Sequence, residues 1–429
     1  MQKIALSFAL ILAISASLIK AGMLQWASLS WAATAALGLS VTVSVSLNKK
    51  ELLFKRLTHP AFLCFIGFQL WVCVQIFTPV SLNTAASIEN ALLGAGFCCL
   101  LILLYFGLRQ PQHLILIYKT LLIFGLLQAT YGLAIAISQH NQLLWMEKIF
   151  YLDRPTGTFV NPNHFAAYLS IILIMLISHA ACHADNNKNA RKSLFWALYD
   201  QVYNPHNIIA GILIITILAT KSIGILGALS LTLLTACIVI SLKHSQIKAL
   251  IITLFCASAI LILFILSIDY SILEQEIEAL SHTVNRRLAL SGASLSMVSE
   301  HWLLGVGGGA FYSVFSAFRD LDIGHSYYNY AHNDYLQFWA EYGIIGLSLL
   351  IAFLFFTLRE NLLVLKKSRN PLKRTFAYTS LYSSLVLAIH SLVDFPLHIP
   401  GYSVLYLSII SVNVALSMNG KNLMPTKNS

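Results

Sequence analysis

Apolar runs of about 20 residues recur along the whole chain, and they restrict its fold more than any other feature. As a helix, such a run spans the hydrocarbon core of a bilayer, which is roughly 30 Å thick. Of the 429 residues, 58% are hydrophobic and 10% are charged, whereas soluble domains have about 45–50% apolar and about 25% charged residues. This composition excludes a soluble fold and intrinsic disorder. We therefore expect an all-α integral membrane protein in which residues 1–429 form a single polytopic domain.

The apolar runs predict about twelve transmembrane helices. They cover residues 4–19, 22–46, 60–78, 88–108, 114–138, 163–181, 207–220, 222–242, 249–268, 336–358, 376–394 and 401–418. The run at 207–220 is short, and Lys221 follows it directly. The first run follows Lys3, so it could instead be a cleaved signal peptide.

The distribution of lysine and arginine predicts the orientation of these helices. With the N-terminus inside, 20 of the 27 basic residues lie in loops on the inner side, in agreement with the positive-inside rule. Both termini are then cytoplasmic, and the loop 139–162, the large loop 269–335 and the turn 394–400 lie on the outer face. The net charge of +10 reflects this topology and does not indicate a nucleic-acid partner. Polar residues beside a bilayer are candidates for a site, so we expect the chemistry on the outer face.

Within the large outer loop, apolar residues recur at steps of three and four from Leu273 to Leu288. This periodicity predicts an amphipathic helix over 271–289 that lies at the membrane surface. Arg287 falls at the edge of the apolar stripe, where a guanidinium group requires a partner.

The strongest polar motif extends from Tyr330 to Gly346, from the outer loop into the tenth helix. His332 could take a proton from a sugar hydroxyl, because imidazole titrates near neutral pH. The alternative is structural, with Asn333 or Asp334 capping the exposed N–H groups at the helix start. Both interpretations can hold, since a capped helix start would also orient His332.

A similar choice applies to Asn161-Pro-Asn-His164. Asn161 is expected to cap a helix that has Pro162 at its first position. The alternative is a polar wall of a substrate site. The candidate substrate-binding residues from the two motifs are Asn163, His164, Asn333 and Asp334.

Four stretches of the chain resemble the family of O-antigen ligases and O-antigen polymerases. They are Arg154–Ala166, Trp302–Phe311, Ala331–Gln337 and His390–His398. They occur in the family's order, within roughly residues 60–415. The resemblance implies a multi-helix, C-type membrane glycosyltransferase in a bacterial inner membrane, with its active site on the periplasmic face. The loops 139–162 and 269–335 are then periplasmic, and the larger one carries the active site.

The resemblance also implies the substrates. The donor is a polyprenyl-pyrophosphate-linked glycan, and the acceptor is the lipid A core or a second lipid-linked glycan. Membrane lipids surround the protein, and no nucleic acid is expected as a partner. The scheme requires neither a cofactor nor a metal ion.

Site residues follow from the same resemblance. The family's histidine in the large outer loop, just before the next helix, matches His332 and implies a general base. The family's arginine before the Gly-rich turn matches Arg287, with Arg286 adjacent. Arginine suits a pyrophosphate because it is always ionised and can bind two phosphate oxygens. In place of the family's Ser-Arg-Gly, this chain has Ile223 at the arginine position, and Lys221 could substitute for it.

Arg154 is a further candidate for binding the pyrophosphate, and its alternative is an ion pair with the adjacent Asp153. Four of the seven outer basic residues are thus assigned to the pyrophosphate, namely Arg287, Arg286, Arg154 and Lys221.

Three other motifs are weaker. The Gly-rich stretch 305–309 is interpreted as a turn, because no Lys-Ser or Lys-Thr follows it as in a phosphate-binding loop. Asp320-Leu-Asp322 resembles the metal motif of sugar-nucleotide transferases, but nucleotide sugars are cytoplasmic and this motif is expected outside. A His/Cys cluster at 179–183 has no evident fourth ligand. We therefore expect metal-independent chemistry.

The acceptor and the class of function leave alternatives. A ligase transfers to the lipid A core, a polymerase to another lipid-linked repeat, and an oligosaccharyltransferase to protein. The last often carries extra C-terminal sequence, and it is not favoured here, because the tail ends soon after the twelfth predicted helix. A membrane transporter or lipid flippase is the alternative from another class, but transporters place ionisable groups near the bilayer midplane, and the runs here are nearly free of charge.

Overall fold

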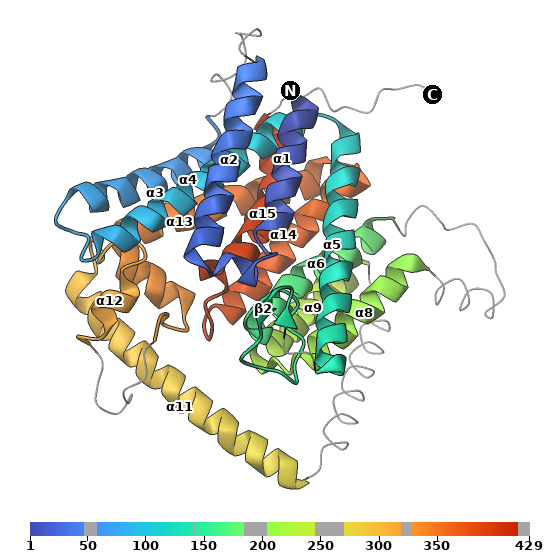
Figure 1. Ribbon diagram of the computed structural model, residues 1–429. Coiled ribbons are helices and arrows are strands. Elements are labelled where there is room, and N and C mark those ends of the chain that lie inside the picture. Colours follow the sequence, from blue (N-terminus) through green and yellow to red (C-terminus); the bar gives the residue numbers. More distant parts are fainter. Residues whose placement is uncertain (47–57, 140–141, 184–203, 245–269, 319–327, 419–429) are drawn as a thin grey trace, which may run out of the picture.

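The computed structural model describes residues 1–46, 58–139, 142–183, 204–244, 270–318 and 328–418 (Figure 1). Two sequence predictions, the transmembrane helix at 249–268 and the Asp320-Leu-Asp322 motif, lie outside these residues. The helices are α1 (Gln2–Ser15), η1 (Lys20–Gly22), α2 (Gln25–Ser46), α3 (Pro60–Phe77), α4 (Thr84–Gly107), α5 (Pro111–Ser138), α6 (Pro162–His183), α8 (Pro205–Ala219), α9 (Ile223–His244), α11 (Tyr270–His301), α12 (Phe311–Phe315), α13 (Asp334–Lys367), α14 (Pro371–His390), η4 (Pro396–His398) and α15 (Pro400–Met418). A short antiparallel hairpin pairs β1 (Gln142–Leu143) with β2 (Met146–Glu147).

Seven of the described helices are long and apolar enough to cross a membrane, namely α2, α3, α4, α5, α6, α13 and α15. The helices α1 and α8 and the first part of α9 are apolar but shorter. These lengths and compositions confirm the all-α membrane class. The number of twelve spans and the sides of the loops stay predictions.

Asparagine caps and prolines explain where several helices begin. Asn83 caps α4 by accepting a hydrogen bond from the N–H of Ala86 at 3.1 Å, and Asn370 caps α14 through the N–H of Lys373 at 3.0 Å. Pro371 follows directly as the first residue of α14. A cap satisfies an N–H group that the helix leaves unpaired, and proline at the first position loses no hydrogen bond.

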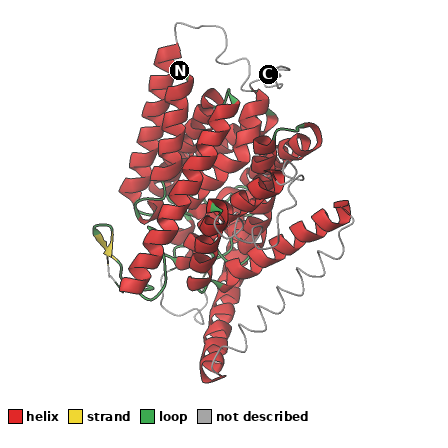
Figure 2. Ribbon diagram, turned by 90° about the vertical axis from the view of Figure 1, so that its right-hand side faces the viewer, coloured by secondary structure: helices red, strands yellow, loops and turns green. Residues whose placement is uncertain are grey.

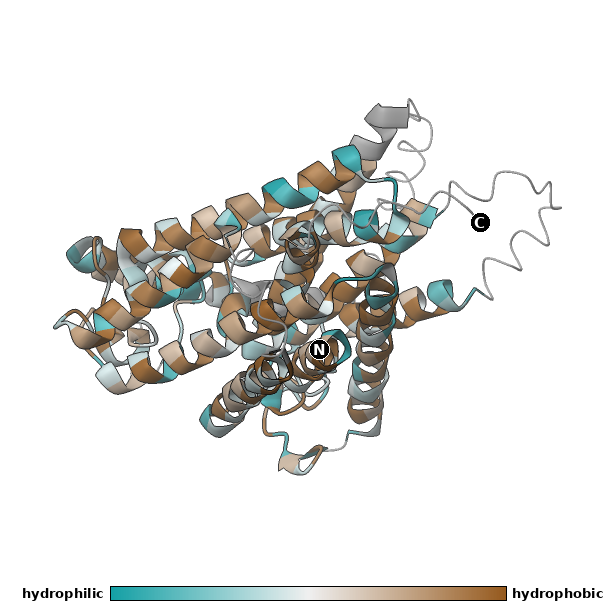
Figure 3. Ribbon diagram, turned by 90° about the horizontal axis from the view of Figure 1, so that it is seen from above, coloured by the Kyte–Doolittle hydropathy of each residue, from teal (hydrophilic) through white to brown (hydrophobic). Residues whose placement is uncertain are grey.

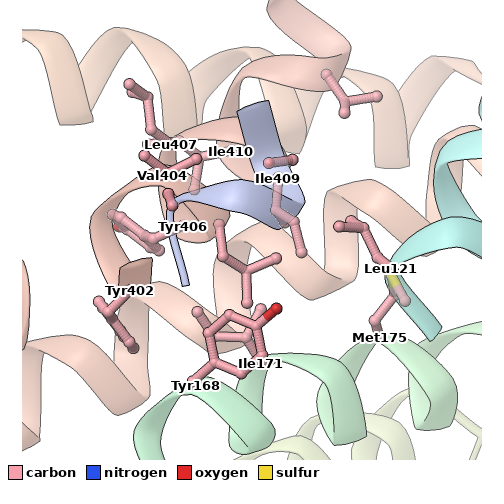
Figure 4. Packing of buried hydrophobic residues seen from close by; sticks show 14 of the residues in the cluster. Leu121, Tyr168, Ile171, Met175, Tyr402, Val404, Tyr406, Leu407, Ile409 and Ile410 are labelled. Atoms are coloured by element: carbon pink, nitrogen blue, oxygen red, sulfur yellow. The ribbon is translucent and has the colours of Figure 1, made fainter. Parts of the chain in front are cut away.

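The helices α6 and α15 lie at the centre of the assembly. In their most apolar windows, 72% and 89% of the residues are buried, against 28% in α2. Figure 4 shows the packing of this core, in which α6 contributes Tyr168, Ile171 and Met175 and α15 contributes Tyr402, Tyr406 and Ile409. Because both helices are enclosed by their neighbours, the residues at their ends, 161–164 and 394–400, are held firmly by the core.

The peripheral helices carry apolar residues on their outer faces as well. Leu37, Leu70 and Phe355 are each about 60% exposed, and Figure 3 shows hydrophobic residues along most of these helices. Exposed apolar side chains of this size, repeated on several helices, fit a surface that contacts lipid.

The helix α11 is longer than the predicted segment 271–289 and extends away from the bundle (Figures 1 and 2). Its C-terminal half continues the apolar stripe through Leu290, Ala293 and Met297, which are buried. These side chains form a separate hydrophobic cluster with Phe311 of α12 and Ala340 of α13. This packing explains why the helix continues to His301, beyond the end of the predicted segment.

The backbone of α13 breaks at Gly343, where φ is 63° and ψ is −176°. This conformation is essentially restricted to glycine. The Gly-rich turn packs into the break, because the N–H of Gly307 donates to the carbonyl of Glu341 at 3.0 Å and the N–H of Ile344 donates to that of Trp302 at 2.8 Å. The stretch 305–309 is therefore a packed turn, as its sequence predicted.

Candidate active site

Three of the four stretches that carry the family resemblance meet around the side chain of Asp394. This residue lies in the turn between α14 and η4, and it is fully buried. Its Oδ1 atom is 3.4 Å from Nε2 of His164 and 3.6 Å from Nδ1 of His332, and its Oδ2 atom is 3.6 Å from Nε2 of His390. We call these four residues the Asp394 cluster. It joins the start of α6, the residue before the cap of α13 and the end of α14.

His332 is the member of this cluster that has access to solvent. Its side chain is 28% exposed, whereas those of His164 and His390 are 1% exposed. Its φ of 51° lies in the left-handed region, a conformation that costs a residue other than glycine about 1–3 kcal/mol. The ring of Phe395 contacts the rings of both His332 and His164 edge-on, at 4.8 and 4.7 Å between centroids.

Hydrogen bonds and nearby imidazoles keep Asp394 ionised. Asn163 Nδ2 donates to its Oδ2 at 3.2 Å, and the N–H of Phe395 donates to its Oδ1 at 3.0 Å. Burial by itself raises the pKa of Asp394, but the polar contacts of His164 and His332 and the charges of His164 and His390 outweigh burial and hold this pKa well below its ordinary value. The site thus contains a buried negative charge beside three imidazoles.

A second buried acidic group lies close by. The carboxylate of Asp334 accepts hydrogen bonds from Ser391 Oγ at 2.8 Å, from the N–H of Leu397 at 3.2 Å and from His398 Nδ1 at 2.7 Å. His398 Nε2 is 3.9 Å from Oε2 of Glu341, which is also buried. Burial opposes the charged form of His398, but the hydrogen bond and charge of Asp334 and the charge of Glu341 raise its pKa. We call Asp334, His398 and Glu341 the His398 cluster.

A cavity of about 510 Å³ opens beside the His398 cluster. It lies between α4, the Gly-rich turn, α13 and η4, and its lining residues are Asn90, Gly309, Tyr312, Asn329, Tyr330, Gln337, Glu341 and His398. Phe395 separates this cavity from the Asp394 cluster, because its ring is stacked on Tyr330 at 4.1 Å and contacts His332 edge-on.

The two arginines of α11 differ in their surroundings. Arg286 is exposed and Arg287 is half-buried. Arg287 lies close enough to His390 for its charge to act on that imidazole. Of the basic residues assigned to the pyrophosphate, Arg287 is therefore the one that the structure brings near the Asp394 cluster.

Arg154 and Lys221 lie on neighbouring loops. Lys221 Nζ forms an exposed ion pair with Asp153 at 3.8 Å, and Lys148 Nζ donates to the carbonyl oxygen of Arg154 at 2.7 Å. Asp153 thus forms its ion pair with Lys221, not with Arg154. Among the described contacts, none joins these two basic side chains to Asp394.

Each of the four candidate substrate residues makes a polar contact within the protein itself. Asn333 caps α13 by accepting from the N–H of Leu336 at 3.1 Å, and Asn161 accepts from the N–H of Asn163 at 2.8 Å, as the capping interpretations predicted. Asn163 and His164 both face Asp394, and Asp334 is 2% exposed and bound to His398.

Asp394, His398 and Glu341 were not predicted as site residues, although the stretch 390–398 carries part of the family resemblance. Two signals were available. His390 and Asp394 are four residues apart beside the outer face, and Glu341 is an acidic residue within an apolar run, where a charge is expensive and often functional.

The His/Cys cluster at the other end of α6 is used in packing. His179 stacks on His183 at 4.0 Å and on Tyr118 at 4.3 Å between ring centroids. Within the described ranges, no group of three or more His, Cys, Asp or Glu side chains has a geometry that could hold a metal ion.

Residues 208–351, about a third of the chain, match the family model described as O-antigen ligase. This range contains Arg287, His332 and Glu341. The match supports the assignment of the chain to the O-antigen ligase and polymerase family, and it confirms the resemblance over this part of the sequence. It also supports a membrane glycosyltransferase-like function in glycan assembly. A search of the curated proteins finds no match.

Proposed function

We propose that this chain, as a member of the O-antigen ligase and polymerase family, transfers a glycan from polyprenyl pyrophosphate to a saccharide hydroxyl on the periplasmic face of a bacterial inner membrane. The observation that carries the proposal is the solvent-accessible imidazole of His332 beside the buried, ionised carboxylate of Asp394. An imidazole paired with a carboxylate is a general base, and the carboxylate stabilises the imidazolium that forms.

In this mechanism His332 takes the proton of the acceptor hydroxyl. Its Nδ1 atom faces Asp394, so a neutral ring with its proton on Nδ1 leaves Nε2 free as the base. The acceptor oxygen attacks the anomeric carbon of the donor, and the bond from that carbon to the pyrophosphate oxygen breaks. The reaction is a single displacement with inversion, and the bonding electrons leave with the polyprenyl pyrophosphate.

Arg287, helped by Arg286, holds the pyrophosphate and meets the charge that develops on it. A guanidinium group stays ionised and can donate two hydrogen bonds to phosphate oxygens. The electrostatic proximity of Arg287 to His390 supports this role, because it puts the cation on the side of the Asp394 cluster. Arg154 and Lys221 are proposed as further contacts of the donor, although no described contact joins their side chains to Asp394.

The test uses the purified protein in vesicles with lipid-linked glycan donor and a saccharide acceptor. Removal of a general base typically lowers a rate by roughly 10²–10⁴-fold, so His332→Ala should lose most transfer while it still inserts and binds donor lipid. His301→Gln is the matched control, because His301 ends α11 and contacts Phe318. A well-inserted His332→Ala protein that transfers at a near wild-type rate would overturn the assignment.

The acceptor is tested with the same preparation. Lipid A core, a second lipid-linked repeat and an acceptor peptide are offered separately, and the product identifies a ligase, a polymerase or an oligosaccharyltransferase. We expect transfer to one of the two saccharide acceptors. Transfer to the peptide alone, or transport of a solute without transfer, would contradict the proposal.

Metal independence is tested by chelation. The scheme above uses only protein side chains, so activity should survive EDTA. Loss of activity that added Mn²⁺ or Mg²⁺ restores would contradict metal independence and would direct attention to Asp320 and Asp322.

A further inference from the structure

The cavity beside the His398 cluster is built for a polar ligand. Its volume of about 510 Å³ lies within the roughly 300–1,000 Å³ that small-molecule sites occupy. Three carboxamides, one carboxylate, one imidazole and two phenol groups line it, from Asn90, Asn329, Gln337, Glu341, His398, Tyr312 and Tyr330. None of these residues has an aliphatic side chain, so the lining does not suit a lipid tail. It suits a ligand that carries many hydroxyl groups.

Two features indicate that this lining is a preformed binding site. Glu341 is 1% exposed, and its carboxylate is fixed by the N–H of Gly309 at 3.0 Å and by Gln337 Nε2 at 3.2 Å. His398 lines the cavity with a side chain that is nine-tenths buried, and its Nε2 atom has no hydrogen-bond partner within the described chain. A buried polar atom without a partner is costly. A hydroxyl group in the cavity would supply the missing hydrogen bond.

An aromatic surface forms another wall. Tyr330 is stacked on Phe395 at 4.1 Å with an angle of 13° between the rings, which fixes the orientation of the Tyr330 ring. Flat aromatic rings pack well against the apolar face of a sugar ring, while the amides and carboxylate can bind its hydroxyl groups. The same Phe395 ring contacts His332 at 4.8 Å, so a single ring lies between the Tyr330 wall of the cavity and the proposed general base.

The charges of the cavity separate it from the donor site. Among the described residues, no lysine or arginine lines the cavity. Glu341 lines it, and Asp334 is hydrogen-bonded to His398 behind it. Even with His398 protonated, the two carboxylates leave a net negative charge here. An anionic group would therefore be repelled, because the repulsion between like charges is strong where water is scarce. The proposed pyrophosphate contact, Arg287, is not one of the lining residues, and its charge acts on His390 of the Asp394 cluster.

We infer that this cavity binds the terminal sugar of the acceptor, and that it selects a neutral, hydroxyl-rich saccharide over one bearing a carboxylate or phosphate. The inference rests on the proposed function for its reaction, but the binding site can be tested without turnover. The sugar lies against Tyr330, donates hydroxyl hydrogen bonds to Glu341, and presents one hydroxyl past the edge of Phe395 to His332.

Binding is tested first with His332→Ala protein, so that no reaction is required. A neutral oligosaccharide with a photoreactive diazirine group is crosslinked to the protein in vesicles, and the labelled peptides are identified by mass spectrometry. We expect labels on peptides that contain Tyr312 or Asn329, and at least tenfold less labelling by the matching probe with a uronic acid at its end. Labels confined to other regions, or stronger labelling by the acidic probe, would overturn the inference.

Kinetics with otherwise wild-type protein gives the second readout. Asn329 is exposed at the mouth of the cavity, so Asn329→Trp fills the space without disturbing the core and should raise the KM for the acceptor at least tenfold. Glu341→Gln keeps the shape but removes the charge, and it should reduce the discrimination against the acidic acceptor. Ala317→Trp is the control, since Ala317 is exposed after α12 and outside the lining.

The two proposals fail in different ways. If the wild-type protein transfers no glycan but the neutral probe labels the cavity, the proposed function fails and the binding site stands. If transfer proceeds and Asn329→Trp leaves the acceptor KM within twofold of wild type, the cavity is not the acceptor site. A rise in the KM of the donor in place of that of the acceptor would equally contradict the inference.

Discussion

At the scale of single residues, the charge of Asp394 organises the site. Three imidazoles lie within 3.6 Å of its carboxylate, and only that of His332 reaches solvent. In a buried environment the attraction between carboxylate and imidazolium is much less screened than in water. A proton that arrives on His332 is therefore stabilised at once, while His164 and His390 hold the carboxylate in place. This division explains how one of three similar residues can serve as the base.

The first prediction concerns Asp394→Asn. The amide keeps the shape but cannot stabilise the imidazolium of His332, so the transfer rate should fall by roughly 10²–10⁴-fold. Donor binding should persist, because Arg287 is unchanged. The measurement is single-turnover transfer in vesicles together with donor binding, and Glu300→Gln, an exposed acid at the end of α11, is the control. A properly inserted Asp394→Asn protein with the wild-type rate would show that the carboxylate does not act on His332.

The second prediction separates the charge of Arg287 from its geometry. Arg287→Lys keeps the positive charge but loses the two-pronged hydrogen bonding, so it should be impaired and not inactive. Arg287→Ala should weaken donor binding as well as turnover, since the pyrophosphate is charged before and during the reaction. Donor affinity and rate are measured for both variants. Equal donor affinity in wild type and Arg287→Ala would exclude Arg287 as a pyrophosphate contact.

The third prediction uses the raised pKa of His398. Burial opposes its charge, but Asp334 and Glu341 raise its pKa above the ordinary value of 6.5. The protonated ring therefore stabilises the fold fully below about pH 6.5, and this contribution is lost as the pH rises through the higher folded-state pKa. The difference in melting temperature between wild type and His398→Gln should be largest at mildly acidic pH and should shrink at alkaline pH. A difference that grows with pH would contradict this assignment.

At the scale of secondary structure, hydropathy predicted most of the helices, because a segment that crosses a bilayer must be both apolar and helical. The caps at Asn161 and Asn333 could also be predicted from the sequence, since capping depends only on residues that are neighbours in the chain. The pairing of Asp394 with His164 and His332 could not be predicted from the sequence, because it depends on how α6, α13 and α14 pack. The break at Gly343 was missed for the same reason, as the turn that fills it is about forty residues away.

The fourth prediction tests this break. A Cβ atom at Gly343 would lie 2.3 Å from the carbonyl oxygen of Leu303, at a φ that side chains rarely adopt. Gly343→Ala should destabilise the protein by about 1–3 kcal/mol or more. Gly292→Ala is the control, because this glycine in α11 has open space around it, and alanine there should stabilise by about 0.4–1 kcal/mol. Thermal unfolding in detergent measures both. Equal effects of the two changes would show that the break is not required.

At the scale of the whole molecule, the function depends on which side of the membrane the two clusters occupy. In Figure 1 the start of α1 lies at the end of the bundle opposite the β1–β2 hairpin, and α11 lies towards the hairpin end. The start of α1 and the hairpin therefore lie at opposite ends of the bundle, and the side of the membrane that each end faces stays a prediction. Polyprenyl-linked glycans can meet a saccharide acceptor in the proposed way only if the Asp394 cluster opens on the outer side.

The fifth prediction fixes the orientation directly. A reporter that is active only in the periplasm should be active when fused after Ser281, in α11, and silent when fused after Lys367, at the end of α13. The reason is the distribution of charge. Lys366 and Lys367 end α13 and Arg369 lies in the loop after it, and a cluster of basic residues is retained on the cytoplasmic side. A reporter that is active in the cytoplasm, fused at the same two positions, controls for expression and should give the opposite pattern. If Ser281 reports cytoplasmic and Lys367 periplasmic, His332 and Arg287 face the cytoplasm, and a periplasmic transfer reaction at this site is impossible.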